Sequence, residues 1–416
     1  MNVLKKVYCR IFQMAFRLAI PLLPYRTPKI LHTVSEVPEL LHAKNIQRVL
    51  IVTDPMIYAA GLTKTLEQAL KNRNVSYTIY EKTVANPTTA NVEEAKQLYI
   101  DRKCQALIGF GGGSSIDCAK IVGARVAKPR KSVAKMKGIL QIRKRIPLLI
   151  AVPTTAGTGS ETTLAAVITD SETRHKFPIN DFSLIPPYAV LDPNLTRTLP
   201  PALTASTGMD ALTHAVEAYI GRSTTRETRA FAIQAVQLIF GNIERAYRDG
   251  EDMAARENML NAAFLAGAAF TKSYVGYCHA VAHSLGGKYN IPHGHANAVL
   301  LPITLEAYGD SVYKKLKELA VAAGLCQETM DEKTAAETFI RKIQDLNRAM
   351  NIPETLPNIQ SADIPALARF ADREANPLYP VPRFMDAEQL QSLYYAVQGD
   401  VRHAGNRNSN TGRKTA

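Results

Sequence analysis

Short apolar runs alternate with amphipathic segments through the first half of the chain, and this alternation constrains the fold more than any other feature of the sequence. Amphipathic stretches near 62–72 and 92–104 are predicted helices. The predicted strands are 48–54, 76–81, 106–110, 147–153 and 188–193. Because strands that alternate with helices indicate a parallel, doubly wound sheet, we expect an α/β domain over residues 29–195.

The second half of the chain has a different pattern, because its apolar residues recur with a period near 3.6 and no convincing strand follows residue 195. A chain of 416 residues is long enough for two domains, each with its own core. The predicted helices are 204–220, 226–249, 255–270 and 313–324. We therefore predict an all-α domain over 196–402, followed by a disordered basic tail (403–416). An amphipathic arm (1–28) precedes the α/β domain.

Composition is that of an ordinary soluble globular protein, with 46% hydrophobic and 21% charged residues. The five cysteines are an odd number and form no CxxC pair, which argues against a disulfide framework. We therefore predict a cytoplasmic protein, kept in a reducing compartment.

The net charge of +13 is concentrated in part in two segments. Ten Lys or Arg residues lie from Lys120 to Arg145, where no acid occurs, and four more lie from Arg402 to Lys414. No aromatic residue interrupts the first run and no nucleic-acid motif accompanies it. We interpret the run as a solvated basic loop and expect no nucleic-acid partner; a functional anion or nucleic-acid surface is the alternative.

The first 26 residues, MNVLKKVYCRIFQMAFRLAIPLLPYR, place apolar side chains partly at helical spacing among Lys5, Lys6, Arg10 and Arg17. The charge-free apolar runs are far shorter than the roughly 20 residues of a spanning helix, and the arginines interrupt any signal-peptide core. A basic amphipathic helix can lie on a membrane surface. We favour the alternative, an arm that packs on its own domain or on a partner subunit.

The stretch ALIGFGGGSSID places Gly111, Gly112 and Gly113 between a predicted strand and a helix that begins near Ser114. Glycines let backbone amides approach a phosphate, and the start of a helix adds partial positive charge. The spacing is neither the GxGxxG fingerprint nor a Walker-type loop. We interpret it as a phosphate-binding loop, with a tight structural turn as the alternative.

A second loop, PTTAGTGSE over 153–161, also follows a strand and offers Thr154, Thr155 and Thr158. Loops at the strand ends of an α/β domain are where nucleotides bind. Asp54 ends the strand RVLIVTD, where a carboxylate suits a ribose 2′-hydroxyl and repels a 2′-phosphate. These features favour NAD over NADP.

Histidines and an acid recur at helical spacing in the second half of the chain. Asp210 and His214 lie four residues apart, as do His279 and His283, so each pair can share one helix face. His293 follows in the turn-like IPHGHAN, where Pro292 and Gly294 are expected to hold it outside a regular helix.

Three imidazoles with one carboxylate suit Fe(II) or Zn(II) and are poor ligands for magnesium or calcium. Histidines packed in a core are the alternative. Spacing alone does not choose the ligands among His279, His283, His293 and His295.

The chain resembles the iron-containing (group III) alcohol dehydrogenases from about residue 29 to about residue 400. The motifs that carry the resemblance are GGGSSID, PTTAGTGSE, LDPNLTRTLPP, TGMDALTHAVEAY and HAVAHSLGGKYNIPHGHANAVLLP. The resemblance implies an α/β dinucleotide-binding domain and an all-α metal-binding domain, an architecture shared with dehydroquinate synthase. It also implies NAD and Fe(II) as cofactors, with Zn(II) as an alternative metal, and a homo-oligomeric enzyme.

The resemblance also assigns roles to individual residues. It implies Asp210, His214, His279 and His293 as metal ligands and places His283 beside the metal and the nicotinamide as a proton relay. It implies no role for His295. The implied cofactor-binding residues are Asp54, Asn86, Gly112, Gly113, Ser114, Asp117, Thr154, Thr155, Thr158 and Lys176. Asn86 in a simple turn and Asp117 as a first-turn helix acid are alternatives for those two.

Together these features predict a metal-dependent, NAD(H)-linked alcohol dehydrogenase or aldehyde reductase acting on a short primary alcohol or diol. The bulky residues Phe270, Tyr274 and Tyr277 precede the first histidine motif and are expected in part to line its substrate pocket. Three alternatives stay open: an NAD-containing hydroxyacid-oxoacid transhydrogenase, a dehydroquinate-synthase-like lyase, and a structural metal module on a membrane.

Overall fold

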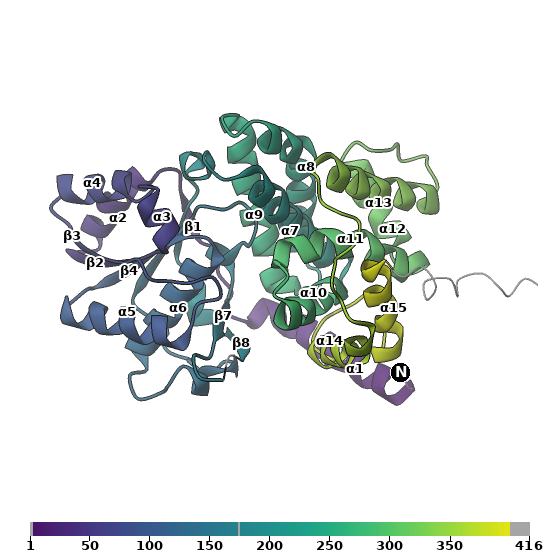
Figure 1. The fold of residues 1–416 in the computed structure, drawn as a ribbon, viewed down its shortest axis with the longest axis horizontal. Coiled ribbons are helices and arrows are strands. Elements are labelled where there is room, and N and C mark those ends of the chain that lie inside the picture. Colours follow the sequence, from purple (N-terminus) through teal and green to yellow (C-terminus); the bar gives the residue numbers. More distant parts are fainter. Residues whose placement is uncertain (1–2, 174, 400–416) are drawn as a thin grey trace, which may run out of the picture. The chain divides into compact units, whose positions relative to one another are not determined.

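A computed structural model describes residues 3–173 and 175–399 (Figure 1), so the predicted tail over 403–416 lies outside the described residues. The chain forms two compact units, each assembled from segments distant in sequence. The helical unit comprises the described parts of Met1–Pro21, Leu212–Gln237 and Ser273–Ala416. The α/β unit comprises Leu22–Ala211 and Leu238–Lys272. The predicted fold class is confirmed, whereas the predicted domain limits stay a prediction.

A six-stranded sheet in the order β1-β9-β6-β4-β2-β3 forms the centre of the α/β unit, and all its neighbouring strands are parallel. The strands are β1 (Lys29–Leu31), β2 (Arg48–Val52), β3 (Ser76–Tyr80), β4 (Ala106–Gly111), β6 (Leu148–Pro153) and β9 (Tyr188–Val190). The five predicted strands are therefore confirmed, and the three-residue β1 is added at one edge.

Helices cover both faces of this sheet. Successive residues of a strand point to opposite faces, and in these strands both sets of residues are apolar. Val49 and Ile51 of β2 pack in one buried cluster with α2 and α4, while Leu50 and Val52 pack in another with α5 and α6. The helices are α2 (Val37–Ala43), α3 (Pro55–Ala59), α4 (Lys64–Asn72), α5 (Thr89–Asp101) and α6 (Gly113–Ala127). The helices predicted near 62–72, near 92–104 and from about Ser114 are confirmed as α4, α5 and α6.

A second, three-stranded sheet in the order β5-β8-β7 was not predicted from the sequence. It consists of β5 (Gly138–Ile139), β7 (Ala165–Thr169) and β8 (Lys176–Asn180). The middle strand carries Pro178, a residue that normally argues against an inner strand because it lacks a backbone N–H. β5 is only two residues long and gives no periodic signal.

Helices account for nearly all regular structure after residue 200. Three of them contribute residues to both units: α7 (Pro201–Ile220), α8 (Arg226–Arg248) and α9 (Met253–Ser273). The helical unit adds α1 (Val3–Ala19), α10 (Tyr277–Tyr289), α11 (His293–Tyr308), α12 (Tyr313–Ala322), α13 (Glu332–Ala349), α14 (Ile364–Ala375) and α15 (Ala387–Gln398). The four helices predicted in this half are confirmed, and α10 packs against α11 and α14. None of the described helices is long and apolar enough to cross a bilayer.

The basic run between residues 120 and 145 is not wholly a solvated loop. Lys120 is fully buried on α6, where its ammonium donates to Ser160 Oγ at 3.1 Å and to Thr163 Oγ1 at 2.8 Å. Arg125 is also buried and bonds Glu93 of α5 and the carbonyl oxygen of Lys128. At least two of the ten cations therefore stabilise the α/β unit and are not available to an external anion.

Candidate metal centre and cofactor loops

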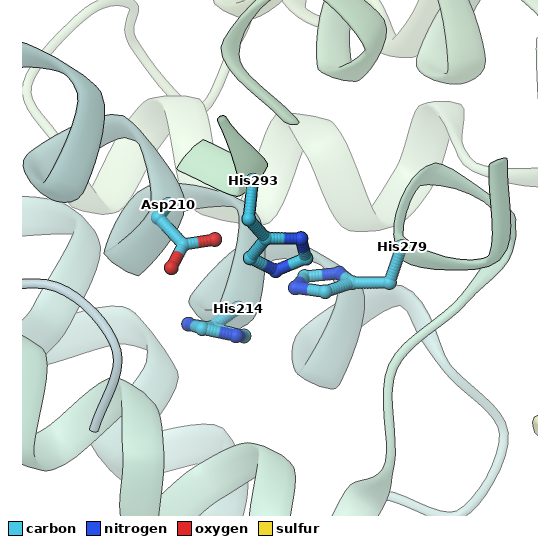
Figure 2. A group of neighbouring side chains, drawn as sticks. All are labelled: Asp210, His214, His279 and His293. Atoms are coloured by element: carbon cyan, nitrogen blue, oxygen red, sulfur yellow. The ribbon is translucent and has the colours of Figure 1, made fainter. Parts of the chain in front are cut away.

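The four residues implied as metal ligands, Asp210, His214, His279 and His293, come together in space (Figure 2). Each offers one ligand atom, and these atoms all lie within 4.8 Å of one another. Asp210 and His214 are one turn apart on α7, His279 lies on α10, and His293 begins α11. All but the half-buried His293 are buried, so the group is shielded from water. The arrangement fits one four-coordinate divalent ion.

Glu217 prepares His279 for a metal by fixing its tautomer. The Nδ1 atom of His279 bonds Glu217 Oε2 at 2.6 Å, so the lone pair lies on Nε2. Burial, reinforced by the neighbouring His214, His293 and His283, lowers the pKa of His279 well below its usual value. The ring is therefore a neutral imidazole at neutral pH, which is the form that ligates a metal.

The same carboxylate anchors the start of α10. Glu217 accepts hydrogen bonds from the backbone N–H groups of Gly276 at 2.8 Å and Cys278 at 2.9 Å. A Cβ atom at Gly276 would lie 2.6 Å from Glu217 Oε1, so only glycine fits there. Sequence reasoning missed Glu217, although an acid three residues after His214 in an apolar helix was an available signal.

His293 lies inside a regular helix, contrary to the prediction from Pro292 and Gly294. Pro292 is the N-cap residue of α11 and His293 is its first residue, a position where a preceding proline favours rather than breaks the helix. Asn297 follows one turn later, and its Nδ2 lies 3.2 Å from Nε2 of both His293 and His279. The two Nε2 atoms thus face a common point. Asn297 was also missed, despite its four-residue spacing from His293.

His283 is not part of the four-residue group but lies beside it. Its ring stacks on His293 with centroids 5.0 Å apart, and its Nδ1 bonds Glu374 Oε1 at 2.6 Å. Tyr379 donates to the same carboxylate oxygen at 2.7 Å. Burial works to raise the pKa of Glu374, but His283 outweighs it and holds that pKa below its usual value. Glu374 is ninety-one residues from His283, and no local pattern predicts this contact.

The remaining aromatic and histidine predictions have mixed outcomes. Tyr277 is fully buried and its hydroxyl bonds Asn376 and Met385, so it packs the helical unit and does not line a substrate pocket. Tyr274 is half-buried, and its ring lies 6.5 Å from that of Tyr379. Phe270 is half-buried near the end of α9. His295, which received no predicted role, is outside the four-residue group.

All the predicted cofactor residues belong to the α/β unit, and all except Lys176, the first residue of β8 in the second sheet, follow strands of the parallel sheet. β4 and β6 are neighbours, with Gly111 paired to Pro153, and β2 lies on the other side of β4. Gly111 has φ +143°, and a Cβ there would lie 2.7 Å from Ser115 Oγ. Gly112 is the N-cap of α6 without a side-chain cap, which leaves the helix start open to a ligand.

Asp54 follows β2 and has two contacts within the protein. Its Oδ1 caps the short helix α3 by accepting from Met56 N and Ile57 N, and its Oδ2 accepts from Ser115 Oγ at 3.3 Å. The carboxylate is half-buried next to the glycine loop. A capping role and contact with a ribose are therefore compatible, because capping uses only Oδ1.

Asn86, Ser114 and Lys176 meet in one cluster. Lys176 Nζ donates to Asn86 Oδ1 at 2.6 Å, and Asn86 N donates to Ser114 Oγ at 3.3 Å. Asn86 has φ +58°, the left-handed conformation that asparagine tolerates in a turn. The structure thus joins three of the predicted cofactor residues from a loop, the start of α6 and the start of β8.

Asp117 accepts hydrogen bonds from the second loop (153–161) and from β7. Its Oδ1 accepts from Ser160 Oγ at 2.6 Å and its Oδ2 accepts from Val167 N at 2.9 Å, with Lys120 Nζ 3.7 Å away. Because both oxygens are engaged within the protein, the geometry gives Asp117 a positioning role for the loop 153–161. The alternative of a first-turn helix acid is wrong, because Asp117 is the fifth residue of α6 and lies beyond its first turn.

The three threonines differ in what holds them. Thr154 N donates to Gly111 O at 3.1 Å, which ties the two loops together. Thr158 lies against Gly113, where a Cβ would be 3.2 Å from its Oγ1. Thr155 Oγ1 is buried without a hydrogen-bond partner among the described residues. A buried hydroxyl with no protein partner is unfavourable unless a ligand or water satisfies it, so Thr155 fits a cofactor contact.

Comparison with known proteins covers nearly the same span as the motifs. Residues 30–193 match the family described as "Iron-containing alcohol dehydrogenase", and residues 204–398 match "Fe-containing alcohol dehydrogenase family, C-terminal". Alcohol dehydrogenase 4 of Saccharomyces cerevisiae is 39% identical over 346 residues, which are 82% of this chain and 89% of the yeast protein.

Two further relatives share the same extent. The NAD-dependent methanol dehydrogenase of Bacillus methanolicus is 35% identical over 340 residues, which are 81% of this chain and 89% of that protein. The crystal structure of a 1,3-propanediol oxidoreductase superposes with a TM-score of 0.84 at 33% identity, covering 89% of this chain and 97% of the other.

Proposed function

This chain belongs to the family of iron-containing alcohol dehydrogenases, and from that premise we propose that it is an NAD(H)-linked dehydrogenase that interconverts a short primary alcohol or diol with its aldehyde. The family uses NAD and a metal ion. The observation that carries the proposal is the convergence of one carboxylate and three imidazoles within 4.8 Å.

We assign Asp210, His214, His279 and His293 as the metal ligands, with Fe(II) favoured by the family and Zn(II) compatible with the same donors. When bound, a divalent metal supplies a Lewis acid that lowers the pKa of an alcohol hydroxyl, and NAD supplies the hydride acceptor. The chain's own contribution is to hold these four side chains, three of them buried, in place, with Glu217 orienting His279.

His283 is proposed to accept the proton that the alcohol hydroxyl loses. Its Nδ1 is engaged by Glu374, so Nε2 is the atom left to receive that proton. Tyr379 and Glu374 hold the ring in this orientation. Because the His283 side chain is 42% exposed, it can pass the proton on to water.

For the cofactor we propose that the open start of α6 and the glycines of its loop bind the pyrophosphate. Asp54 Oδ2 is placed for a ribose 2′-hydroxyl and Thr155 for another cofactor hydroxyl. The carboxylate would repel a 2′-phosphate, which favours NAD over NADP. The printed name of the Bacillus methanolicus relative agrees with this preference.

A small, uncharged substrate is supported by the aromatic residues Tyr274 and Tyr379 near His283, and by relatives named for methanol and 1,3-propanediol. We therefore propose short primary alcohols and diols, with their aldehydes, as the substrate class. A homo-oligomeric state and a cytoplasmic location stay predictions of the sequence.

The test is aldehyde-dependent NADH oxidation by metal-stripped protein that has been reloaded anaerobically with Fe(II) or Zn(II). We expect one of the metals to restore turnover with a C2–C4 aldehyde, with NADH preferred to NADPH. His295→Ala should retain that activity, because His295 lies outside the ligand group.

Two results would contradict the proposal. Stoichiometric metal binding without turnover on any aldehyde would rule out the proposed dehydrogenase activity. Exchange between a hydroxyacid and an oxoacid without added NAD would instead identify the transhydrogenase alternative.

A further inference from the structure

Helix α1 is attached to the helical unit by its polar side. Arg10 donates to Val381 O at 2.8 Å and Pro382 O at 2.9 Å, and Gln13 donates to Pro377 O at 3.1 Å and Tyr379 O at 2.7 Å. Lys5 forms an ion pair with Asp372 of α14 at 3.1 Å, and the Arg10 guanidinium lies over the ring of Phe384. These contacts fix which face of α1 points outward.

The outward face of α1 is apolar, the reverse of what a surface helix normally presents. Gln13 and Cys9 are almost fully buried, whereas Leu4 is 79% and Leu18 is 71% exposed. The exposed large apolar residues, named here the outer stripe, are Leu4, Val7, Tyr8, Ile11, Phe12, Met14 and Leu18. Their spacing keeps them on one side of a 17-residue helix. A contiguous exposed apolar surface of this kind marks an interaction site.

Charge identifies the kind of partner that suits this stripe. Residues 1–35 contain no Asp or Glu, and Lys6 and Arg17 on α1 are exposed. The whole chain carries a net charge of +13. An apolar stripe on a helix whose charged side chains are all basic complements a surface that is apolar within and negatively charged outside, as an anionic phospholipid bilayer is.

A second copy of α1 is a poorer partner for two physical reasons. Two such helices would place two segments whose charged side chains are all basic next to each other, with no acid on either helix. The face is also small: 17 residues at about 1.5 Å each give a strip roughly 25 Å long and 10 Å wide, well under the about 800 Å² per partner of a typical stable interface.

We propose that α1 is a membrane-surface anchor whose outer stripe lies in the interface of an anionic bilayer while Arg10 and Gln13 hold the helix to the enzyme. Attachment is peripheral, because no described helix can cross a bilayer. This inference does not rest on the dehydrogenase proposal. It also reconciles the two interpretations of the arm, since α1 packs on its own unit and still offers an apolar face.

The experiment is flotation of the full-length holoenzyme with phosphatidylcholine vesicles that contain or lack phosphatidylglycerol, at low and high salt. We expect flotation with the anionic vesicles only, weakened by salt. Ile11→Glu/Leu18→Glu should reduce vesicle affinity by roughly tenfold or more, because two charges replace apolar contacts. Lys6→Gln and Arg17→Gln should each reduce it roughly fivefold.

Ile100→Glu is the matched control, since Ile100 is an apolar residue that is 48% exposed on α5 of the other unit. It should float like the natural protein, and all variants should keep their dehydrogenase activity and helical circular dichroism. Failure of the natural protein to float, or equal flotation of the Ile11/Leu18 double variant, would overturn the proposal. A halved mass of that variant in solution, without vesicle binding by the natural protein, would identify a second copy as the partner.

Discussion

The histidine group and the glycine loops both hold polar groups ready for a ligand, but they are built from different parts of the chain. The histidine group consists of side chains on helices α7, α10 and α11, fixed by the buried carboxylate of Glu217. The loops consist of backbone and small side chains after β4 and β6, and Thr154 N joins them through Gly111 O.

This difference determines how each region should respond to substitution. In the histidine group the loss of one side chain removes a ligand that no neighbour replaces. In the loops the proposed ligand-binding atoms are backbone amides. A substitution there is therefore harmful when it adds a side-chain atom that clashes or changes a charge next to the cofactor. The first region should therefore fail in metal binding with a stable fold, and the second should fail in stability and cofactor selectivity.

His279→Ala should have the largest effect. It removes one of the four proposed ligands and leaves Glu217 without its histidine partner, so we expect loss of bound metal and a fall in kcat/KM of roughly 1,000-fold or more. Metal content by elemental analysis and NADH oxidation measure this, with His295→Ala as the control. A variant that keeps stoichiometric metal would remove His279 from the ligand set.

Gly111→Ala tests the loops with a single added methyl group. At φ +143° the new Cβ would lie 2.7 Å from Ser115 Oγ and 2.9 Å from Ser115 Cβ. We expect the free energy of unfolding to fall by about 2–4 kcal/mol, measured in urea. Gly241→Ala on α8 meets nothing within 4 Å and should be neutral or slightly stabilising. Equal stability of the two variants would show that the loop relaxes freely.

Glu161, at the end of the second loop, should make stability depend on pH. Burial raises its pKa to about 7 from 4.5, so between these values the folded state binds more protons than the unfolded state. The free energy of unfolding should therefore fall as pH rises through this window. Glu161→Gln should be more stable than the natural protein by about 2–3 kcal/mol at pH 8 and similar to it near pH 4.5. A pH-independent difference in urea unfolding would contradict this account.

Glu217→Gln tests whether the hydrogen bond between Glu217 and His279 affects metal binding while all four proposed ligands stay in place. The amide keeps the shape of the side chain but orients His279 less strongly, so we expect metal affinity to fall roughly 10- to 100-fold with little change in unfolding. Competition with a chelator measures the affinity. Glu318→Gln is the control, because Glu318 accepts from Tyr219 and not from a histidine. Matching affinities for both variants would assign Glu217 to packing alone.

Asp54→Asn should have the smallest effect. The amide oxygen can still cap α3, but the negative charge facing a 2′-phosphate is gone. We expect the ratio of kcat/KM for NADPH to that for NADH to rise roughly tenfold, with unfolding unchanged. An unchanged ratio would leave Asp54 with the capping role only.

Local pattern predicted much of what the structure shows. The runs ending at Asp54, Gly111 and Pro153 were recognisable as strands, because each is a continuous apolar segment next to a turn signal. Choosing His279 and His293 over His283 and His295 needed the family resemblance, since spacing is the same for ligands and neighbours.

The features that the sequence did not predict depend on contacts between distant parts of the chain. Glu374 reaches His283 across ninety-one residues, and nothing near either residue signals the pairing. The strand with Pro178 forms because it is paired on both sides, although its own sequence opposes it. Helical periodicity predicted α1, but only its bonds to Val381 and Pro382 reveal which face is turned inward.

The attachment of α1 affects how any shortened form of this enzyme would be interpreted. Removing the helix would expose the carbonyl oxygens of Pro377, Tyr379, Val381 and Pro382, which Gln13 and Arg10 now satisfy. Tyr379 also bonds Glu374, the partner of His283, so the loss would extend from the N-terminal helix to the proton-accepting histidine. Truncation would therefore confound attachment with catalysis, whereas substitutions confined to the outer stripe leave that hydrogen-bond chain intact.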